Sequence, residues 1–142
     1  MGTKTYDPNQ IKANFGPHLL TGFAKGTFIK VTRDEDTFKK YVGADGVVTR
    51  IRSRNKSGSI EFTLSQASPS NDFLSAIALQ DELLGTGIMP AAVKDMNGTT
   101  LAAGGEAWVV KPAETEYGDD ATTRPWKIDV AQLTSFVGGH LL

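Results

Sequence analysis

Apolar and polar residues alternate in short stretches along most of this chain, which is the pattern of strands that bury one face. The alternation is most regular near the middle, where Ile60, Phe62 and Leu64 share one predicted face. Glu61 and Thr63 share the other. From the same pattern and its bounding glycines and prolines, further strands are predicted at residues 10–15, 27–33, 47–54, 91–95, 99–103, 106–111 and 124–130.

The strands at 47–54 and 59–64 are predicted to form a hairpin around the loop at residues 55–58. This register places Ile51 opposite Phe62 and Arg52 opposite Glu61, so it satisfies both faces at once. It also predicts one polar sheet face, made of Arg50, Arg52, Arg54, Glu61 and Thr63. Such a face is either solvated or paired with a partner, or it is a stripe that binds nucleic acid.

One helix is predicted from Ser70 to Leu84, because Ser68-Pro69 suits its N-terminus and Gly85 suits its C-terminus. Its apolar residues cover an arc of about 160°, wider than the ~100° stripe that packing on one sheet requires. The excess predicts either more burial within the subunit or a contact with another subunit. The core is predicted to include Ile51, Ile60, Phe62, Leu64, Phe73, Ile77, Trp108, Trp126 and Ile128.

A charged excursion separates the strand at 27–33 from the strand at 47–54, and a Gly43-Ala44-Asp45-Gly46 turn closes it. It runs from acidic to basic residues and contains two aromatic side chains. Such a segment is either an ordinary solvated excursion or an arm that docks on a neighbouring subunit. The candidate contact residues are Asp34, Glu35, Asp36, Phe38, Lys39, Lys40 and Tyr41.

Composition bounds the class of protein. At 142 residues, the chain is expected to form a single domain over residues 1–142 without disulfides or metals, and it has no cysteine. Fifteen basic and sixteen acidic residues give a net charge of −1, which argues against a dedicated binder of nucleic-acid backbones. The first residues lack a secretory signal, and no stretch approaches the ~18 apolar residues of a membrane span, so no membrane anchor is expected.

No constellation of catalytic or metal-binding residues is apparent. The two histidines, His18 and His140, have no positioned partner in the sequence, and the glycines do not form a phosphate-binding loop. Gly104 and Gly105 are predicted to mark a bend or bulge instead. We therefore expect no enzyme activity, no catalytic residue and no cofactor, which favours a structural role.

The order of these parts resembles the tail tube proteins of contractile-tailed bacteriophages, which are related in fold to type VI secretion tube proteins. The resemblance lies in the combination of the strand at 27–33, the charged excursion, the hairpin to Leu64, the helix and the segment Trp126-Lys127-Ile128-Asp129-Val130 before Gly138-Gly139. It covers most of the chain. The fold that it implies is mainly β, an antiparallel β-sandwich or barrel with one flanking α-helix.

The resemblance also implies a function. The chain would be a virion subunit, made in the host cytoplasm, that assembles with itself into stacked hexameric rings, and these would conduct genomic DNA during ejection without binding it specifically. The tail sheath protein and the baseplate or tail terminator proteins would be further partners. Residues 34–46 correspond to the loop that reaches an adjacent ring in that family. The polar face named above is a possible lumen surface, provided that acidic residues offset its arginines.

Alternatives from other classes remain open. The arginine-rich hairpin is compatible with a nucleic-acid-binding barrel of the OB type, although the net charge and the few neighbouring aromatics count against it. A small hydrolase that uses exposed carboxylates is a further class, for which the sequence offers no geometry. Within the tube family itself, the alternative to a phage tail tube is a tailocin or secretion-system tube subunit.

Overall fold

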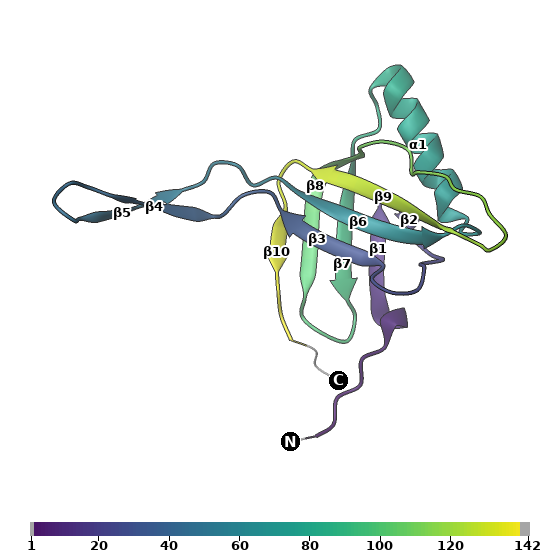
Figure 1. Cartoon of the computed structure of the whole chain (residues 1–142), viewed down its shortest axis with the longest axis horizontal. Helices are drawn as coiled ribbons and strands as arrows, with labels where there is room; N and C mark the ends of the chain where they lie inside the picture. Colours follow the sequence, from purple (N-terminus) through teal and green to yellow (C-terminus); the bar gives the residue numbers. More distant parts are fainter. Residues whose placement is uncertain (1, 140–142) are drawn as a thin grey trace.

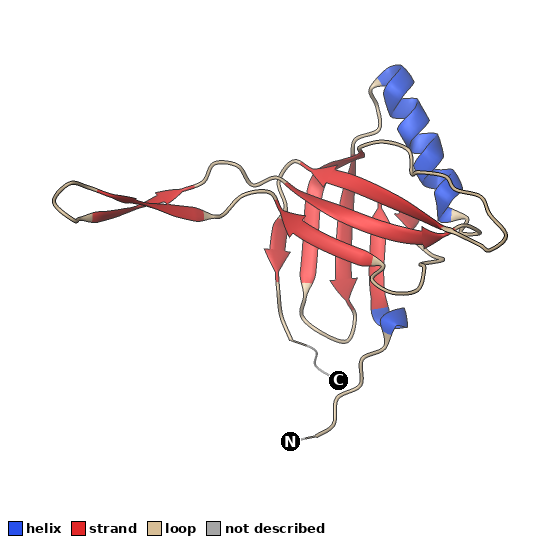
Figure 2. Cartoon of the chain, in the orientation of Figure 1, coloured by secondary structure: helices blue, strands red, loops and turns tan. Residues whose placement is uncertain are grey.

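The computed structural model describes residues 2–139, so His140 lies outside the described residues. Within these residues antiparallel strands dominate, with a single α-helix at one end (Figures 1 and 2). In chain order the elements are a 3-10 helix at Pro8–Gln10, β1 (Ile11–Phe15), β2 (His18–Leu19), β3 (Ile29–Arg33), β4 (Phe38–Val42), β5 (Val48–Arg52), β6 (Gly58–Ser65), α1 (Ser70–Leu84), β7 (Met89–Asp95), β8 (Leu101–Val109), β9 (Thr123–Val130) and β10 (Thr134–Phe136).

Eight strands form one curled sheet. Its order is β2-β1-β7-β8-β9-β6-β3, and β10 also pairs with β8. In Figure 1 the strands β3, β6 and β9 cross β1, β7 and β8, so the sheet folds over on itself into two layers. The prediction of a mainly β, antiparallel fold with one flanking helix is confirmed. Strands β4 and β5 stand apart as a separate two-stranded sheet.

Strand β8 joins the two layers because it changes partner along its length. Its first residues, 101–103, pair with β10, and its last residues, 107–109, pair with β9. The sequence predicted two strands here, at 99–103 and 106–111, whereas the structure has one bent strand. The register with β7 also shifts between Met89 and Ala91, which marks the same corner on the neighbouring strand.

Gly104 lies at this corner and its lack of a side chain is a packing requirement. A Cβ atom at this position would overlap the side chain of Val130 and lie 2.9 Å from the carbonyl oxygen of Gln132. At Gly105 a Cβ would meet nothing within 4 Å. The prediction that these two glycines mark a bend is confirmed, and Gly104 is the residue that permits close approach.

The core lies between the two layers. Alternate residues of β6 and β9 point into it, and Ile60, Phe62, Leu64, Trp126 and Ile128 are all at most 3% exposed. These strands pair over eight residues, with Ile60 opposite Ile128 and Phe62 opposite Trp126. Large apolar pairs on one face explain why β6 is central to the fold.

Helix α1 has the predicted bounds, and it ends at Gly85, whose φ of 70° is the left-handed conformation that glycine favours. The N-cap residue is Pro69, which has no side-chain cap, and the Ser70 amide donates to Ser68 Oγ at 3.2 Å. Leu74 and Ile77 are buried. Phe73 is only partly buried, but it packs against the core and its ring contacts Phe15 edge to face.

The predicted hairpin between 47–54 and 59–64 is wrong. Strand β5 pairs with β4, and β6 pairs with β3 and β9. The physical reason is that β5 has no buried face, since all five of its residues are exposed, whereas β6 needs apolar neighbours on both sides. Ile51, predicted to be core, is 39% exposed for the same reason.

Trp108 is the other core prediction that the structure does not support. It lies in β8 opposite Asp129, between Ala107 and Val109, whose side chains point into the core. Because successive side chains in a strand point to opposite faces, Trp108 lies on the outer face and is half-buried. The tryptophan of the core is Trp126.

Candidate assembly surfaces

The charged excursion forms an extended hairpin that projects from the body of the protein, and we call residues 38–52 the arm (Figure 1). Strands β4 and β5 pair from Phe38 with Arg52 to Val42 with Val48. The Gly43-Ala44-Asp45-Gly46 turn closes the tip, as predicted, and Gly46 has a φ of 85°. Every residue of both strands is exposed.

Alternation assigns each arm residue to one of two faces. Phe38, Lys40, Val42, Val48, Arg50 and Arg52 share one face, because they are alternate residues or direct partners across the pair. The guanidinium carbon of Arg50 lies 4.1 Å from the centre of the Phe38 ring, and that of Arg52 lies at 5.8 Å. Such cation–π contacts contribute about 0.5–1 kcal/mol at exposed sites and favour one orientation of these side chains.

The arm is fixed to the body by hydrogen bonds at its base. Ser57 Oγ donates to Asp34 Oδ2 at 2.6 Å, and Ser53 Oγ donates to Glu35 Oε2 at 3.2 Å. The backbone amide of Ser53 donates to the carbonyl of Thr37 at 2.8 Å. Two of the three acidic residues thus accept hydrogen bonds at the base of the arm. These bonds attach the arm to the body, unlike an ordinary solvated loop.

Charge is therefore unevenly distributed along the excursion. The acidic residues Asp34, Glu35 and Asp36 lie at the base, whereas the arm itself carries four basic residues and one acidic residue. The acidic one, Asp45, accepts the Val47 amide in the turn at 3.1 Å. The basic ones are Lys39, Lys40, Arg50 and Arg52. The arm has a net charge of +3 at neutral pH.

The structure separates the residues of the predicted polar sheet face, so that prediction is wrong. Arg50 and Arg52 lie on the arm and Arg54 follows it, whereas Glu61 and Thr63 lie on the outer face of β6. Among the described residues no carboxylate forms an ion pair with any of these three arginines. The cause is the change of pairing partner described above.

The outer face of β3, β6 and β9 carries its own balanced charges. Glu61 lies directly opposite Lys30 of β3 on one side and Lys127 of β9 on the other. Asp129 is the fourth charged residue of this face, opposite Ser59. Two bases and two acids in register give a polar surface with no net charge. Sequence analysis identified only the β6 part of this face.

Helix α1 leaves much of its apolar arc exposed. Leu79, Leu83 and Leu84 are 57%, 72% and 71% exposed. Leu79 and Leu83 are four residues apart and lie opposite the buried stripe that contains Leu74 and Ile77. We call Ala76, Leu79, Glu82 and Leu83 the helix outer face. The wide apolar arc is thus not explained by burial within the subunit.

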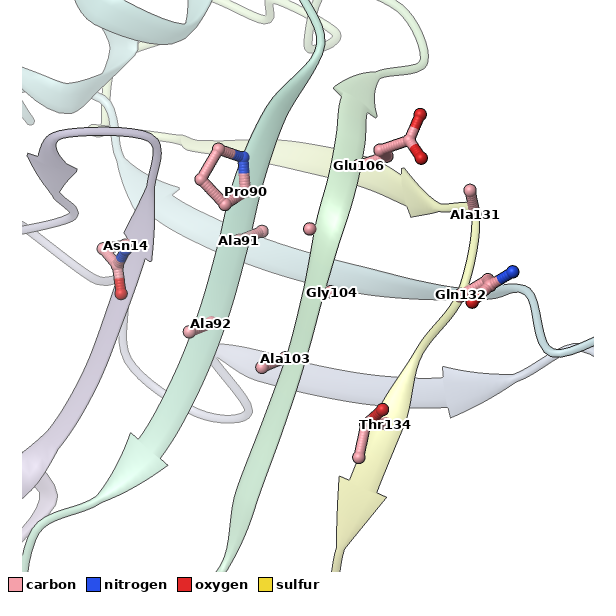
Figure 3. A pocket seen from close by; sticks show the side chains of 11 residues that line it. Asn14, Pro90, Ala91, Ala92, Ala103, Gly104, Glu106, Ala131, Gln132 and Thr134 are labelled. Atoms are coloured by element: carbon pink, nitrogen blue, oxygen red, sulfur yellow. The ribbon is translucent and has the colours of Figure 1, made fainter.

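A shallow depression lies on the side of the sheet formed by β1, β7, β8 and the segment leading to β10 (Figure 3). Its volume is about 560 Å³, and small side chains such as Ala92 and Ala103 form its floor. Asn14, Gln132 and Glu106 supply polar groups at its margin. The lining contains one acid and no base, and no set of groups suited to chemistry.

His18 packs against the start of helix α1. Its Nε2 atom lies 2.9 Å from Ser70 Oγ, and its ring stacks on Phe73 with centroids 4.4 Å apart. Ser70 Oγ also accepts the amide of Thr21 at 3.0 Å. These contacts attach β2 to the start of the helix. Within residues 2–139 no three potential metal ligands gather, and no helix has the length and apolar character to span a bilayer.

Comparison with known proteins identifies the family. A family model described as the bacteriophage PhiTE tail tube protein matches residues 15–138. The chain belongs to this family. A curated relative, structural protein ORF10 of Pseudomonas phage KPP10, is 32% identical over 146 residues, which covers 97% of this chain and 84% of the relative. Members of the tail tube family are structural components of the phage tail, and the resemblance found in the sequence is confirmed.

Solved structures share the fold. The sheath/tube terminator of PVC, an extracellular contractile injection system, aligns with a TM-score of 0.66 and 10% identity over 95% of this chain and 99% of that chain. The tube terminating cap of the anti-feeding prophage AFP aligns with a TM-score of 0.59 and 6% identity over 96% and 93%. The tail tube family member described here therefore has the architecture of tube-end proteins from contractile systems.

Sequence reasoning missed half of the arm. It assigned the candidate contact residues to 34–41 and placed residues 47–54 in a hairpin with residues 59–64. In the structure Val42, Val47 and Val48 are 57–60% exposed around the tip. The signal that was available is the turn at 43–46 with β-branched residues on both sides, which is the pattern of a self-contained hairpin.

Proposed function

We propose that this chain is a subunit of a phage tail tube, which assembles as stacked hexameric rings and conducts genomic DNA during ejection. The observation that carries this proposal is the arm, a hairpin with ten exposed strand residues that makes no core of its own. An isolated two-stranded hairpin is marginally stable in water. An arm of this kind gains its stability and its role from a second subunit, and membership of the tail tube family supplies the context.

Residues Asp34, Glu35, Asp36, Phe38, Lys39, Lys40 and Tyr41 remain our candidates for contact with an adjacent ring. Within this set, Asp34 and Glu35 accept hydrogen bonds at the base of the arm, and the aromatic and basic residues lie exposed on the arm itself. Tyr41 is 61% exposed on the face opposite Phe38. Both faces of the arm thus offer an aromatic ring to a neighbour.

We further propose that the outer face of β3, β6 and β9 lines the bore. DNA must slide through a tube, and each phosphate that the wall neutralises adds to binding. The two bases and two acids of this face cancel, with Glu61 between Lys30 and Lys127. The arm arginines have no acidic cross-strand neighbour and form no ion pair within residues 2–139, so we place them outside the lumen, against protein partners such as the adjacent ring or the tail sheath.

A second candidate function is a tube terminator. The two solved structures that share the fold are a sheath/tube terminator and a tube terminating cap, and each aligns over more than nine-tenths of this chain. A terminator would add a final ring and contact the sheath, but would not stack on itself. An arm that reaches the adjacent ring suits either role. The two candidates differ in what the pure protein builds.

Negative-stain electron microscopy of the purified chain tests the proposal. A tube subunit is expected to form stacked rings or tubes of indefinite length at high protein concentration. Single rings that never stack would favour the terminator. A monomer at all concentrations that binds single-stranded DNA in a salt-dependent manner would contradict both and favour an OB-like nucleic-acid-binding barrel.

A further inference from the structure

The two ends of this molecule carry complementary surfaces. The arm projects at one end of the longest axis, and helix α1 lies at the other (Figure 1). We infer that the arm of one copy docks on the helix outer face of another copy. This inference rests on the proposed self-assembly and adds the receiving surface to it. The contact joins residues near the arm tip to Leu79, Glu82 and Leu83.

Charge complementarity is the first argument. The arm has a net charge of +3, whereas helix α1 contains three acidic residues and no basic one. The segment between β8 and β9, residues 110–122, adds four acids and one base at the same end of the molecule. Opposite patches of this kind steer association and fix which surfaces meet. Two arms or two helices would repel each other instead.

The end of the helix strengthens this preference. The last turn of α1 contains no basic residue, so the partial negative charge of the helix C-terminus is not offset by a side chain. Glu82 lies in that turn and is exposed. A lysine or arginine from a second copy would supply the missing positive charge. Lys40 and Arg50, direct partners on one face of the arm, are the candidates.

Exposed apolar groups on both surfaces give the second argument. Val42 and Val48 are direct partners next to the turn and share a face with Lys40 and Arg50. They are 57% and 60% exposed, and the helix offers Leu83 at 72%. Burial of such side chains yields roughly 25 cal/mol for each Å² removed from water. The two surfaces therefore match in their apolar patches as well as in charge.

The geometry excludes a contact within one chain and favours a repeating one. A five-residue strand spans about 17 Å, so the paired part of the arm alone reaches well beyond the body. Because the two patches differ and lie at opposite ends, one copy can give its arm to a second copy while it receives the arm of a third. This is a heterologous contact, which generates rings or stacked assemblies.

Cross-linking of full-length protein tests the contact. The chain has no cysteine, so Val48→Cys with Leu83→Cys introduces the only two thiols. We expect a short bis-maleimide to convert this variant into a ladder of covalent multimers on a denaturing gel, with the arm and helix peptides joined. Each single variant has one thiol per chain, so cross-linking could yield no product larger than a covalent dimer. The matched control is Val48→Cys with Glu106→Cys, which places the second thiol at the depression of Figure 3.

A charge exchange provides an independent readout. We expect Arg50→Glu and Glu82→Arg to weaken association by roughly tenfold or more each, as measured by analytical ultracentrifugation. The double variant should recover, because the pair is restored with its signs exchanged. Lys25→Glu, an exposed change on another loop, is the control for net charge and should leave association unchanged.

The outcomes separate this inference from the proposed function. Rings or tubes without the arm-to-helix product, or a ladder from the Glu106 control instead, would overturn this contact and leave self-assembly intact. A double charge variant that fails to recover would also overturn it. Absence of both multimers and cross-linked product would overturn the contact and the proposed function together.

Discussion

The indole N–H of Trp126 donates a hydrogen bond to Asn71 Oδ1 at 2.9 Å and so joins strand β9 to the first turn of helix α1. The amide nitrogen of Asn71 in turn donates to the carbonyl of Ser65 at 3.0 Å, at the end of β6. We expect Trp126→Phe to lower the free energy of unfolding by about 1–3 kcal/mol, because it leaves a partly buried acceptor without its donor. Urea denaturation measures this.

Trp108→Phe is the matched control for that experiment. Trp108 is half-buried on the outer face of β8, and among the described residues its ring nitrogen has no partner. Trp108→Phe should lower the free energy of unfolding by less than half as much as Trp126→Phe does. Equal losses for the two variants would show that ring size, and not the hydrogen bond to Asn71, determines the effect.

Phe62→Ala tests the core. Phe62 is 1% exposed and opposite Trp126, so we expect a loss of ~3–5 kcal/mol, the usual cost of removing a buried ring. Ile51→Ala, on the arm, should change stability by less than about 1 kcal/mol, since its side chain is 39% exposed. Thermal or denaturant unfolding that ranked Ile51 above Phe62 would contradict the assignment of core and arm.

Gly104→Ala tests the corner of β8. The added methyl group would overlap Val130, so we expect a destabilisation of about 1–3 kcal/mol. Gly105→Ala introduces the same group one residue later, where nothing lies within 4 Å, and should be neutral or nearly so. If both variants unfold at the same denaturant concentration, close packing at Gly104 is not the reason for the glycine.

Replacement of the arm separates folding from assembly. We expect a variant with residues 38–52 exchanged for a short Gly/Ser linker to lose only the strand signal of β4 and β5 from its circular dichroism spectrum and to keep its cooperative unfolding, because the arm forms its own sheet. The same variant should form no stacked tubes by electron microscopy. Tubes of normal length from this variant would remove the basis for the inter-ring role.

Glu61→Lys tests the proposed bore. Three lysines would then lie side by side on β3, β6 and β9, which costs about 0.2–1 kcal/mol by repulsion across strands. Assembled tubes of this variant should retain duplex DNA more strongly at low salt than at high salt. Glu106→Lys, at the depression of Figure 3, is the control. Equal retention by both variants would show that the β6 face is not the wall.

Sequence reasoning succeeded where local signals were sufficient. The helix bounds follow from Ser68-Pro69 and Gly85, which act on neighbouring backbone groups, and the inward faces of β6 and β9 follow from period-two alternation. The pairing of strands is a different matter. The alternation of residues 47–54 is compatible with pairing to either β4 or β6. The choice is decided by β6, which is buried between β3 and β9 and so has no free edge for residues 47–54.

The candidate surfaces were predictable in part. The charged excursion and its turn identified one strand of the arm. Its second strand was predicted to pair with residues 59–64, with Ile51 in the core, because valine and isoleucine are as common in half-buried strands as in hairpins. The broad apolar arc of the helix was visible in the sequence. Which part of that arc remains exposed depends on the angle at which the helix meets the sheet, and no local signal encodes that angle.

The attachment of the arm has a mechanical consequence. Residues 34–37 connect β3 to the arm, and residues 53–57 connect the arm to β6. Strands β3 and β6 are adjacent in the body, and the two connections are bonded where the Asp34 amide donates to the Ser57 carbonyl at 3.1 Å. A pull on the arm tip is therefore transmitted along β6, whose eight residue pairs with β9 are loaded in shear together. Such a joint resists rupture far better than one whose pairs open one at a time, which suits a structural component of a phage tail.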